Sequence, residues 1–178
     1  MNIVLVILGA LILLTFAWGS LSAAPWLPTK KAQRQELVKT VPLKTGETVY
    51  DLGCGDGSVL FALVRANPGI KAVGLEISLL PFLIAWTRKL ARPRKYKNVS
   101  LKYKNFFWED LSRADVVFIF LLSKCYNRLI SKFYHELKDD CLVVVEAWSL
   151  PEFNENKTIK KEGLLPVYFY KGKQFRAW

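Results

Sequence analysis

The chain has 178 residues, of which 52% are hydrophobic and 23% are charged. This length fits one domain of about 150 residues with a single core, and the composition excludes a disordered chain. The net charge of +11 leaves two interpretations open: a basic face near anionic lipid, or steering toward an anionic substrate such as RNA. The three cysteines lack CxxC spacing and there is one histidine, so neither a disulfide framework nor a metal site is expected.

Residues 1–24 are predicted to form a transmembrane anchor. No charged residue lies between Ile3 and Ala24, and about 20 apolar residues at 1.5 Å each span a bilayer core of about 30 Å. A cleaved signal peptide is the alternative, but no basic residue precedes the apolar run and Pro25 follows Ala24 directly. The basic residues just after the run are Lys30, Lys31, Arg34 and Lys39. The positive-inside rule therefore predicts that the rest of the chain is cytoplasmic.

Residues 25–47 are expected to be a linker followed by a helix. The two prolines of PWLPT (25–29) make the link rigid, and Thr29 is expected to cap a helix from Lys30 to Val41. An alternative role for the link, and for Thr29 in particular, is to fold over a bound ligand. A Thr45-Gly46 turn then leads into a domain of residues 48–178.

Strands and helices alternate through the first hundred residues of this domain. Strands are predicted at 48–52, 71–76, 99–103, 115–122 and 141–147. Helices are predicted at 58–67, 81–90 and 127–137, and residues 157–161 and 167–171 form a closing antiparallel hairpin. The pattern predicts an α/β fold, a Rossmann-like doubly wound sheet that is mostly parallel and covered on both faces.

Ligands of such sheets bind beyond the carboxyl ends of the strands, near the point where the strand order reverses. Polar or aromatic residues stand at four of these predicted ends, and they are Asp51, Glu76, Asn105 and Phe120–Ser123. We expect these four strand ends to form one binding site.

The first strand runs into a glycine loop, VYDLGCGDGSVL. Its glycines are Gly53, Gly55 and Gly57. This spacing departs from the GxGxxG of dinucleotide sites, and Asp51 and Asp56 would repel a pyrophosphate. A ligand that carries an ammonium and a sulfonium but no phosphate suits the loop, and S-adenosyl-L-methionine is such a ligand. Glu76 stands 19 residues after Gly57, where a carboxylate can accept both ribose hydroxyls; a charge at a helix N-terminus is the alternative.

With these motifs, residues 48–171 resemble the class I, seven-stranded S-adenosylmethionine-dependent methyltransferases. VYDLGCGDG is similar to the first motif of that superfamily and GLEIS to the second. The apolar N-terminus, PWLPT and FFWEDLSRADVVFIFLL resemble the FAM173-type membrane-anchored protein-lysine methyltransferases. This resemblance implies methylation of lysine in a membrane protein, at the mitochondrial inner membrane in a eukaryote or the cytoplasmic membrane in a prokaryote.

The resemblance also implies roles for single residues. Asp51, Gly53 and Gly55 are expected to line the methionine part of the cofactor, with Gly57 completing the loop, and Glu76 to hold the ribose. An acidic residue usually reads the adenine amino group in this superfamily, and Asn105 stands in its place here. The Asn105 amide oxygen can still accept a hydrogen bond, and Phe106 can pack on the adenine ring.

The acceptor site is expected after the fourth and fifth strands, with Phe120, Ser123 and Trp148 as its residues. No NPPY-type motif occurs there, which argues against methylation of base or glutamine amide nitrogens. No Pro-Cys pair occurs either, which argues against carbon methylation of pyrimidines, so amines, hydroxyls and carboxyls remain as acceptors. A dry pocket beside the sulfonium lowers the pKa of a lysine and favours its neutral form, so no dedicated general base is required. The sequence offers no clear candidate for one. A lipid or hydrophobic small molecule is the alternative acceptor. A non-catalytic cofactor-binding or RNA-binding protein is the alternative class, although nucleic acid is not the expected partner.

Overall fold

The computed structural model describes residues 2–4, 6–7, 9–10, 14–15 and 26–177. The strands are β1 (Thr48–Leu52), β2 (Lys71–Glu76), β3 (Val99–Tyr103), β4 (Val116–Ile119), β5 (Leu142–Glu146), β6 (Lys157–Ile159) and β7 (Val167–Lys171). The α-helices are α2 (Lys31–Thr40), α3 (Ser58–Ala66), α4 (Leu79–Leu90) and α5 (Tyr126–Glu136). Three short 3-10 helices are η1 (Phe106–Trp108), η2 (Ser123–Cys125) and η3 (Gly172–Ala177).

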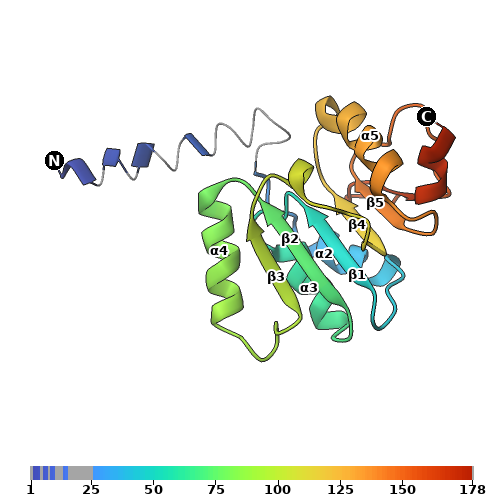
Figure 1. Ribbon diagram of the computed structural model, residues 1–178. Coiled ribbons are helices and arrows are strands. Elements are labelled where there is room, and N and C mark those ends of the chain that lie inside the picture. Colours follow the sequence, from blue (N-terminus) through green and yellow to red (C-terminus); the bar gives the residue numbers. More distant parts are fainter. Residues whose placement is uncertain (1, 5, 8, 11–13, 16–25, 178) are drawn as a thin grey trace.

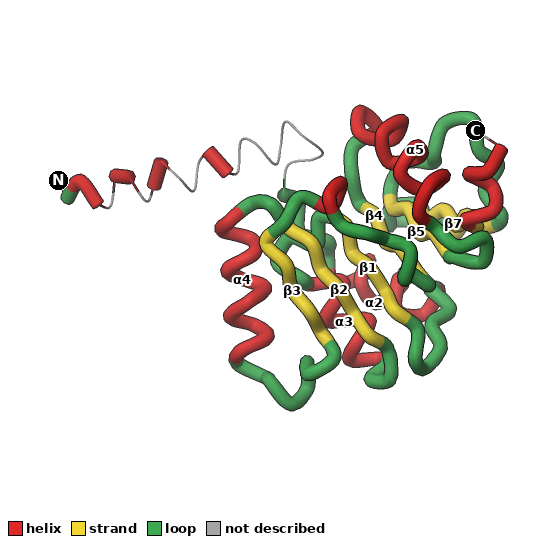
Figure 2. The backbone as a smooth tube through the Cα atoms, viewed as in Figure 1, coloured by secondary structure: helices red, strands yellow, loops and turns green. Residues whose placement is uncertain are grey.

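These strands form one sheet in the order β3-β2-β1-β4-β5-β7-β6 (Figures 1 and 2). The first five strands are parallel, whereas β7 pairs antiparallel with both β5 and β6. The chain builds outward from β1 to β3 and then returns to place β4 on the other side of β1. The carboxyl ends of β1 and β4 therefore flank the switch point, where ligands of such sheets bind. The predicted α/β class, with a mostly parallel sheet and a closing hairpin, is confirmed.

Two hydrophobic layers hold the sheet between its helices. Along β4, Val116 and Phe118 face a layer that includes residues of α2, α3 and α4, while Val117 and Ile119 face a layer that includes α5 and η3. Because successive side chains of a strand point to opposite faces, the apolar run of β4 fills both layers at once. The N-terminal helix α2 belongs to the domain core, because Leu37 is fully buried among residues of α3.

Two details of the predicted elements are wrong. The fourth strand ends at Ile119 rather than at residue 122, because its neighbours end at the same level: Ile119 pairs with Leu52 and Val145, and the chain beyond Leu52 turns away into the glycine loop. Thr29 does not cap α2. The N-cap is Lys30, without a side-chain hydrogen bond, and the Thr29 carbonyl oxygen accepts a hydrogen bond from the Arg34 guanidinium.

Most of the predicted anchor, residues 1–24, lies outside the described residues. Those parts of it that are described, at 3–4, 6–7, 9–10 and 14–15, have helical backbone. Within the described part of the chain, no helix combines the length and the hydropathy needed to cross a bilayer.

Candidate active site

The glycine loop connects β1 to α3 and forms one wall of the pocket described below. Gly53, Gly55 and Gly57 all have positive φ angles, of 82°, 54° and 72°, which favour glycine strongly. A side chain at Gly55 would also collide with the indole ring of Trp26, since a Cβ atom there would lie 2.9 Å from two ring atoms. The loop therefore bends tightly enough for Trp26 to pack directly on its backbone.

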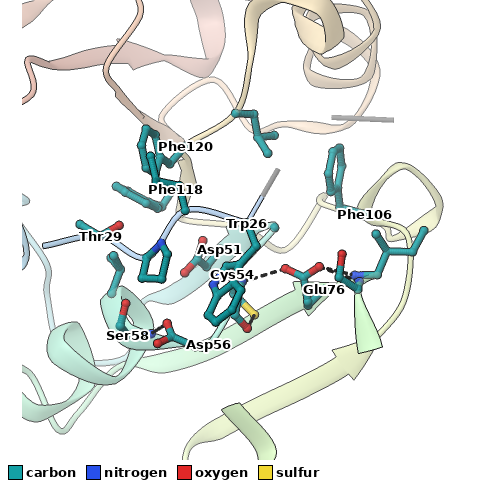
Figure 3. A pocket seen from close by; sticks show the side chains of 18 of the residues that line it. Trp26, Thr29, Asp51, Cys54, Asp56, Ser58, Glu76, Phe106, Phe118 and Phe120 are labelled. Atoms are coloured by element: carbon teal, nitrogen blue, oxygen red, sulfur yellow. Dashed lines mark hydrogen bonds between the residues drawn. The ribbon is translucent and has the colours of Figure 1, made fainter. Parts of the chain in front are cut away.

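Glu76 lies at the end of β2 and fixes this loop. Its carboxylate accepts hydrogen bonds from the backbone amides of Gly55 (2.8 Å), Ile77 (2.9 Å) and Ser78 (2.7 Å) (Figure 3). Burial raises the pKa of Glu76, and these amide donors oppose that rise. Glu76 thus has two tasks, because the carboxylate predicted to hold the ribose also organises the loop that carries the methionine end.

Asp51 lies on β1 below the loop, almost completely buried. Burial raises its pKa well above the usual range, and the neighbouring carboxylates of Glu76, Glu146 and Asp56 raise it further. No lysine or arginine of the described chain forms an ion pair with Asp51 or Glu76. These two carboxylates form an acidic floor that is suited to a cationic ligand.

Asp56 also lines the pocket, but unlike Asp51 and Glu76 it has a cationic partner. Its carboxylate forms an ion pair of 2.6 Å with Arg88 of α4, and it also accepts a hydrogen bond from the Ser58 amide at the start of α3. Arg88 donates a further bond of 2.9 Å to the Asp56 carbonyl oxygen. The charge of Asp56 is therefore neutralised by α4, and its role is to fasten the loop to that helix.

The pocket lies above the carboxyl ends of β1, β2 and β4 (Figure 3). The segment from Trp26 to Thr29, which we call the strap, closes one side of it, and Phe118 and Phe120 of the β4 side stand near Thr29. Trp148, which follows β5, completes the wall beside Phe120. The rings of Phe120 and Trp148 are stacked, with centroids 6.2 Å apart.

Most residues predicted for the cofactor line this pocket. They are Thr29, Asp51, Gly53, Gly55, Glu76, Asn105 and Phe106. Gly57 is not part of the lining; it is the N-cap of α3, where its positive φ lets the helix begin. The Asn105 amide oxygen already accepts a hydrogen bond of 3.0 Å from the Phe107 amide, by which Asn105 caps η1. A hydrogen bond from the adenine amino group would therefore share this oxygen with the cap. Phe106 lies across the pocket from the β4 aromatics, where it can pack on a ring.

Among the predicted acceptor residues, Phe120 and Trp148 line the pocket, whereas Ser123 lies exposed in η2, outside its wall. Ser123 lies outside because β4 ends early and the chain has turned away by that point. His135 is exposed on α5, with its Nδ1 next to the Ser131 carbonyl oxygen (2.7 Å).

Sequence reasoning missed Trp26 and Glu146. The position of Trp26 between two prolines fixes the course of the strap, and this was the signal available for it. The signal for Glu146 was a single charge in the otherwise apolar run CLVVVEA.

The residues present fit S-adenosylmethionine. Gly53 and Gly55 of the glycine loop line the pocket, the acidic floor suits an ammonium and a sulfonium, and Phe106 provides an apolar face for adenine. A dinucleotide is excluded, since its pyrophosphate would face Asp51 and Glu76 without a neutralising cation.

Comparison with known proteins agrees with this geometry. The sequence model of the ANTKMT methyltransferase domain matches residues 51–157. A protein-lysine N-methyltransferase of Saccharolobus islandicus (strain REY15A) is 30% identical over 138 residues, which cover 78% of this chain and 85% of that protein. The chain belongs to the ANTKMT methyltransferase family. It is a class I methyltransferase of the FAM173 type, and its methyl donor is S-adenosyl-L-methionine.

Solved structures agree on the fold. An RNA methyltransferase from Salinibacter ruber, in complex with S-adenosyl-L-homocysteine, superposes with a TM-score of 0.75 at 24% identity over 82% of this chain and 93% of that one. A precorrin-6y C5,15-methyltransferase from Geobacter metallireducens GS-15 gives a TM-score of 0.58 at 21% identity over 82% and 89%. At these identities the likeness concerns the fold of the methyltransferase.

When bound, S-adenosylmethionine supplies an electrophilic methyl group on a positively charged sulfur. The loop and Glu76 are the parts of the chain that would orient the donor, and the strap and the aromatic residues are the parts that would exclude water. The stacked pair Phe120 and Trp148 borders the side of the pocket opposite Phe106.

Proposed function

We propose that this methyltransferase acts on the ε-amino group of lysine in a protein. The observation that carries the proposal is the aromatic border of the pocket above an acidic floor. Trp148 is 47% exposed and stacks on Phe120, so the apolar stem of a lysine can lie along these rings while its ammonium points inward. The protein-lysine N-methyltransferase of Saccharolobus islandicus, of comparable length, supports the same acceptor.

We further propose that the enzyme works at a membrane, with residues 1–24 as the anchor and the domain on the cytoplasmic side. The sequence between Ile3 and Ala24 carries no charge, and the flanking Lys30, Lys31 and Lys39 are exposed. Helix α4 adds a surface for the same environment. It buries Pro81 and Ala85 and exposes four large apolar side chains at helical spacing, Leu80, Leu83, Trp86 and Leu90.

The basic residues at the C-terminal end of α4 and the contact at its N-terminal end also support an α4 that faces the membrane. Basic residues stand in the last turn of α4 and just after it, and these are Lys89, Arg92, Arg94, Lys95 and Lys97, while Arg88 is paired with Asp56. An apolar stripe beside basic residues matches the interface of an anionic leaflet. At the other end of the helix, the amide of Leu79 donates a hydrogen bond of 3.2 Å to Thr15 Oγ1, which belongs to the N-terminal segment.

The acceptor is tested with membranes from cells that lack the enzyme, incubated with the full chain and radiolabelled S-adenosylmethionine. We expect label in protein, released as ε-N-methyllysine on hydrolysis, and none with Glu76→Ala, which lacks the ribose carboxylate. Label confined to the lipid extract, or removed by ribonuclease, would overturn the lysine acceptor and identify the alternative.

The location is tested by fractionating cells that express the full chain and treating sealed membranes with protease from either side. We expect the enzyme in the membrane fraction, cleaved from the cytoplasmic side alone. A double variant, Leu83→Glu with Trp86→Glu, should lower the rate of labelling of membrane protein, while the matched change Leu165→Glu on the exposed β6–β7 connection should not. Recovery of the wild-type enzyme in the soluble fraction would refute the anchor.

A further inference from the structure

Glu146, the last residue of β5, carries an unexplained buried carboxylate. It has no exposed surface, and neither carboxylate oxygen has a hydrogen-bond partner in the described part of the chain. Three other buried carboxylates are partnered within the described chain: Asp56 by Arg88, Glu76 by backbone amides, and Glu109 by Lys104. Asp51 forms no ion pair either, but it lines the pocket, where the donor would face it. Burying an unpartnered carboxylate is costly, so its retention calls for a ligand that completes it.

The sheet register places Glu146 beside the active site. Phe118 of β4 pairs with both Asp51 and Val144, so these three side chains point to the same face. Glu146 lies two residues after Val144 and faces the same way, one row nearer the carboxyl edge. The electrostatic effect of Glu146 on Asp51, whose pKa it raises, agrees with this proximity.

The described residues around Glu146 provide no hydrogen-bond donor and no cation for its carboxylate. Its strand partner on β7 is Val167, and Phe120 continues β4 on the other side. The amide of the buried Gln33 covers this end of β7, but both of its polar atoms are engaged by the backbone of Leu165, at 3.1 and 3.0 Å. Among the residues that the structure describes, no hydrogen-bond donor is directed at the Glu146 carboxylate.

The backbone after Glu146 is strained in a way that connects it to the pocket. Ala147 has φ of 79°, a left-handed conformation that non-glycine residues rarely adopt and that is frequent at functional sites. This turn lets Trp148 stand at the pocket wall while Glu146 stays inside the sheet layer. Trp148, two residues after Glu146, is half exposed and lines the pocket, so this end of β5 lies next to the surface that an acceptor would approach.

We propose that Glu146 binds the ammonium group of the acceptor lysine and removes its proton before methyl transfer. The proposal rests on the proposed function, because it needs a cation with N–H donors as acceptor. One proton passes from the ammonium to a Glu146 carboxylate oxygen, which leaves a neutral amine and a neutral carboxylic acid. The amine lone pair then forms the N–C bond as the C–S bond breaks, with that electron pair going to sulfur and the positive charge to the methylated nitrogen.

The electrostatics of the site are consistent with a proton acceptor. Burial raises the pKa of Glu146 to about 7, so the carboxylate takes up a proton readily near neutral pH. The titratable group facing it is Asp51 of β1, on which Glu76 and Asp56 act in turn. Its other neighbours, Phe120, Val167 and Gln33, carry no charge.

Glu146→Gln tests the proposal in the full chain, with the membrane-protein fraction of enzyme-deficient cells as the probe and tritiated S-adenosylmethionine as the donor. At pH 7 we expect methyllysine formation about 100-fold slower than in the wild type, the range ascribed to general-base catalysis. Calorimetry should show S-adenosylmethionine affinity within about twofold of the wild type, as Glu146 is buried behind the pocket wall and is not one of the residues that line it. The ratio of the wild-type rate to the Glu146→Gln rate should fall about tenfold per pH unit from pH 7 to pH 9. The reason is that the neutral fraction of a lysine with a pKa of about 10.4 rises about tenfold per pH unit in this range.

Two further variants keep the outcome decisive. Glu146→Asp retains a carboxylate and should recover part of the rate, and Glu162→Gln makes the same chemical change at an exposed site and should leave the rate unchanged. Equal rates and equal pH profiles for Glu146→Gln and the wild type, with methyllysine as product, would overturn the role of Glu146 alone. A wild-type product other than methyllysine would instead overturn the proposed function.

Discussion

Replacing Glu146 by glutamine should make the protein more stable at high pH. Folding raises the pKa of this carboxyl from an ordinary 4.5 to about 7, so the folded chain holds the proton more tightly than the unfolded chain. Its burial costs little below pH 4.5, and the cost grows as the pH rises through 4.5 to 7. At 1.36 kcal/mol per unit of pKa difference, burying the Glu146 carboxyl lowers the free energy of unfolding by about 3 kcal/mol at pH 8 and by about 1 kcal/mol at pH 5.

Glutamine does not ionise, and therefore it avoids a penalty that depends on pH. An unpartnered amide has a cost of its own, but that cost is the same at both pH values. The sensitive quantity is hence the change in the stability difference between variant and wild type, which should widen by about 2 kcal/mol from pH 5 to pH 8. Removing the Glu146 charge also removes its repulsion of the Asp51 carboxylate, which raises the pKa of Asp51 in the wild type. This effect also makes the variant more stable than the wild type at high pH.

The measurement is urea unfolding of the full chain in a mild detergent, followed by the fluorescence of its six tryptophans at pH 5, 6, 7 and 8. Glu162→Gln, an exposed change of the same kind, should show a constant difference from the wild type. A constant difference for Glu146→Gln as well would refute the reasoning, because it would mean that the carboxyl is solvated or partnered in the folded chain.

Three further changes test the loop and its supports. Glu76→Ala should weaken S-adenosylmethionine binding at least about tenfold by calorimetry, since it removes the carboxylate predicted to hold the ribose and three hydrogen bonds to backbone amides, one of them from Gly55 in the loop; unchanged affinity would contradict the assignment. Gly55→Ala should destabilise the fold by about 1–2 kcal/mol from its positive φ, and Trp26→Ala should remove the added collision but not this strain. Arg88→Met leaves Asp56 unpaired and should lower thermal stability, whereas Arg88→Met with Asp56→Asn should recover most of the loss.

The parallel part of the fold was predictable because its signals are local. Apolar runs of strand length, such as that containing Val116–Ile119, and the glycines after β1 fix the elements and the strand ends. The same reasoning placed Asp51 and Glu76 in one site, since carboxyl ends of parallel strands share an edge. Where β4 ends was not predictable from its own residues, because it depends on where its partner strands stop pairing.

The rest of the site depends on contacts between residues far apart in the sequence. Arg88 meets Asp56 across 32 residues, and Gln33 meets Leu165 across 132, and nothing in the local sequence announces either pair. Glu146 was visible as a charge within an apolar strand, but only the register shows that no partner faces it. Thr29 is a residue type that caps helices well, but the N-cap of α2 is Lys30, one residue later, and Thr29 lines the pocket instead.

The acidic floor meets a different ligand before and after each turnover. S-adenosylmethionine carries a sulfonium charge that S-adenosylhomocysteine lacks, so carboxylates without a neutralising cation, as Asp51 and Glu76 are in the described chain, attract the donor more than the spent product. This preference opposes product inhibition. The donor's positive charge would also lower the pKa of Asp51, which burial and the neighbouring carboxylates raise in the free protein. Methyl transfer removes that charge, so the pKa of Asp51 should be lower with the donor bound than with the product bound.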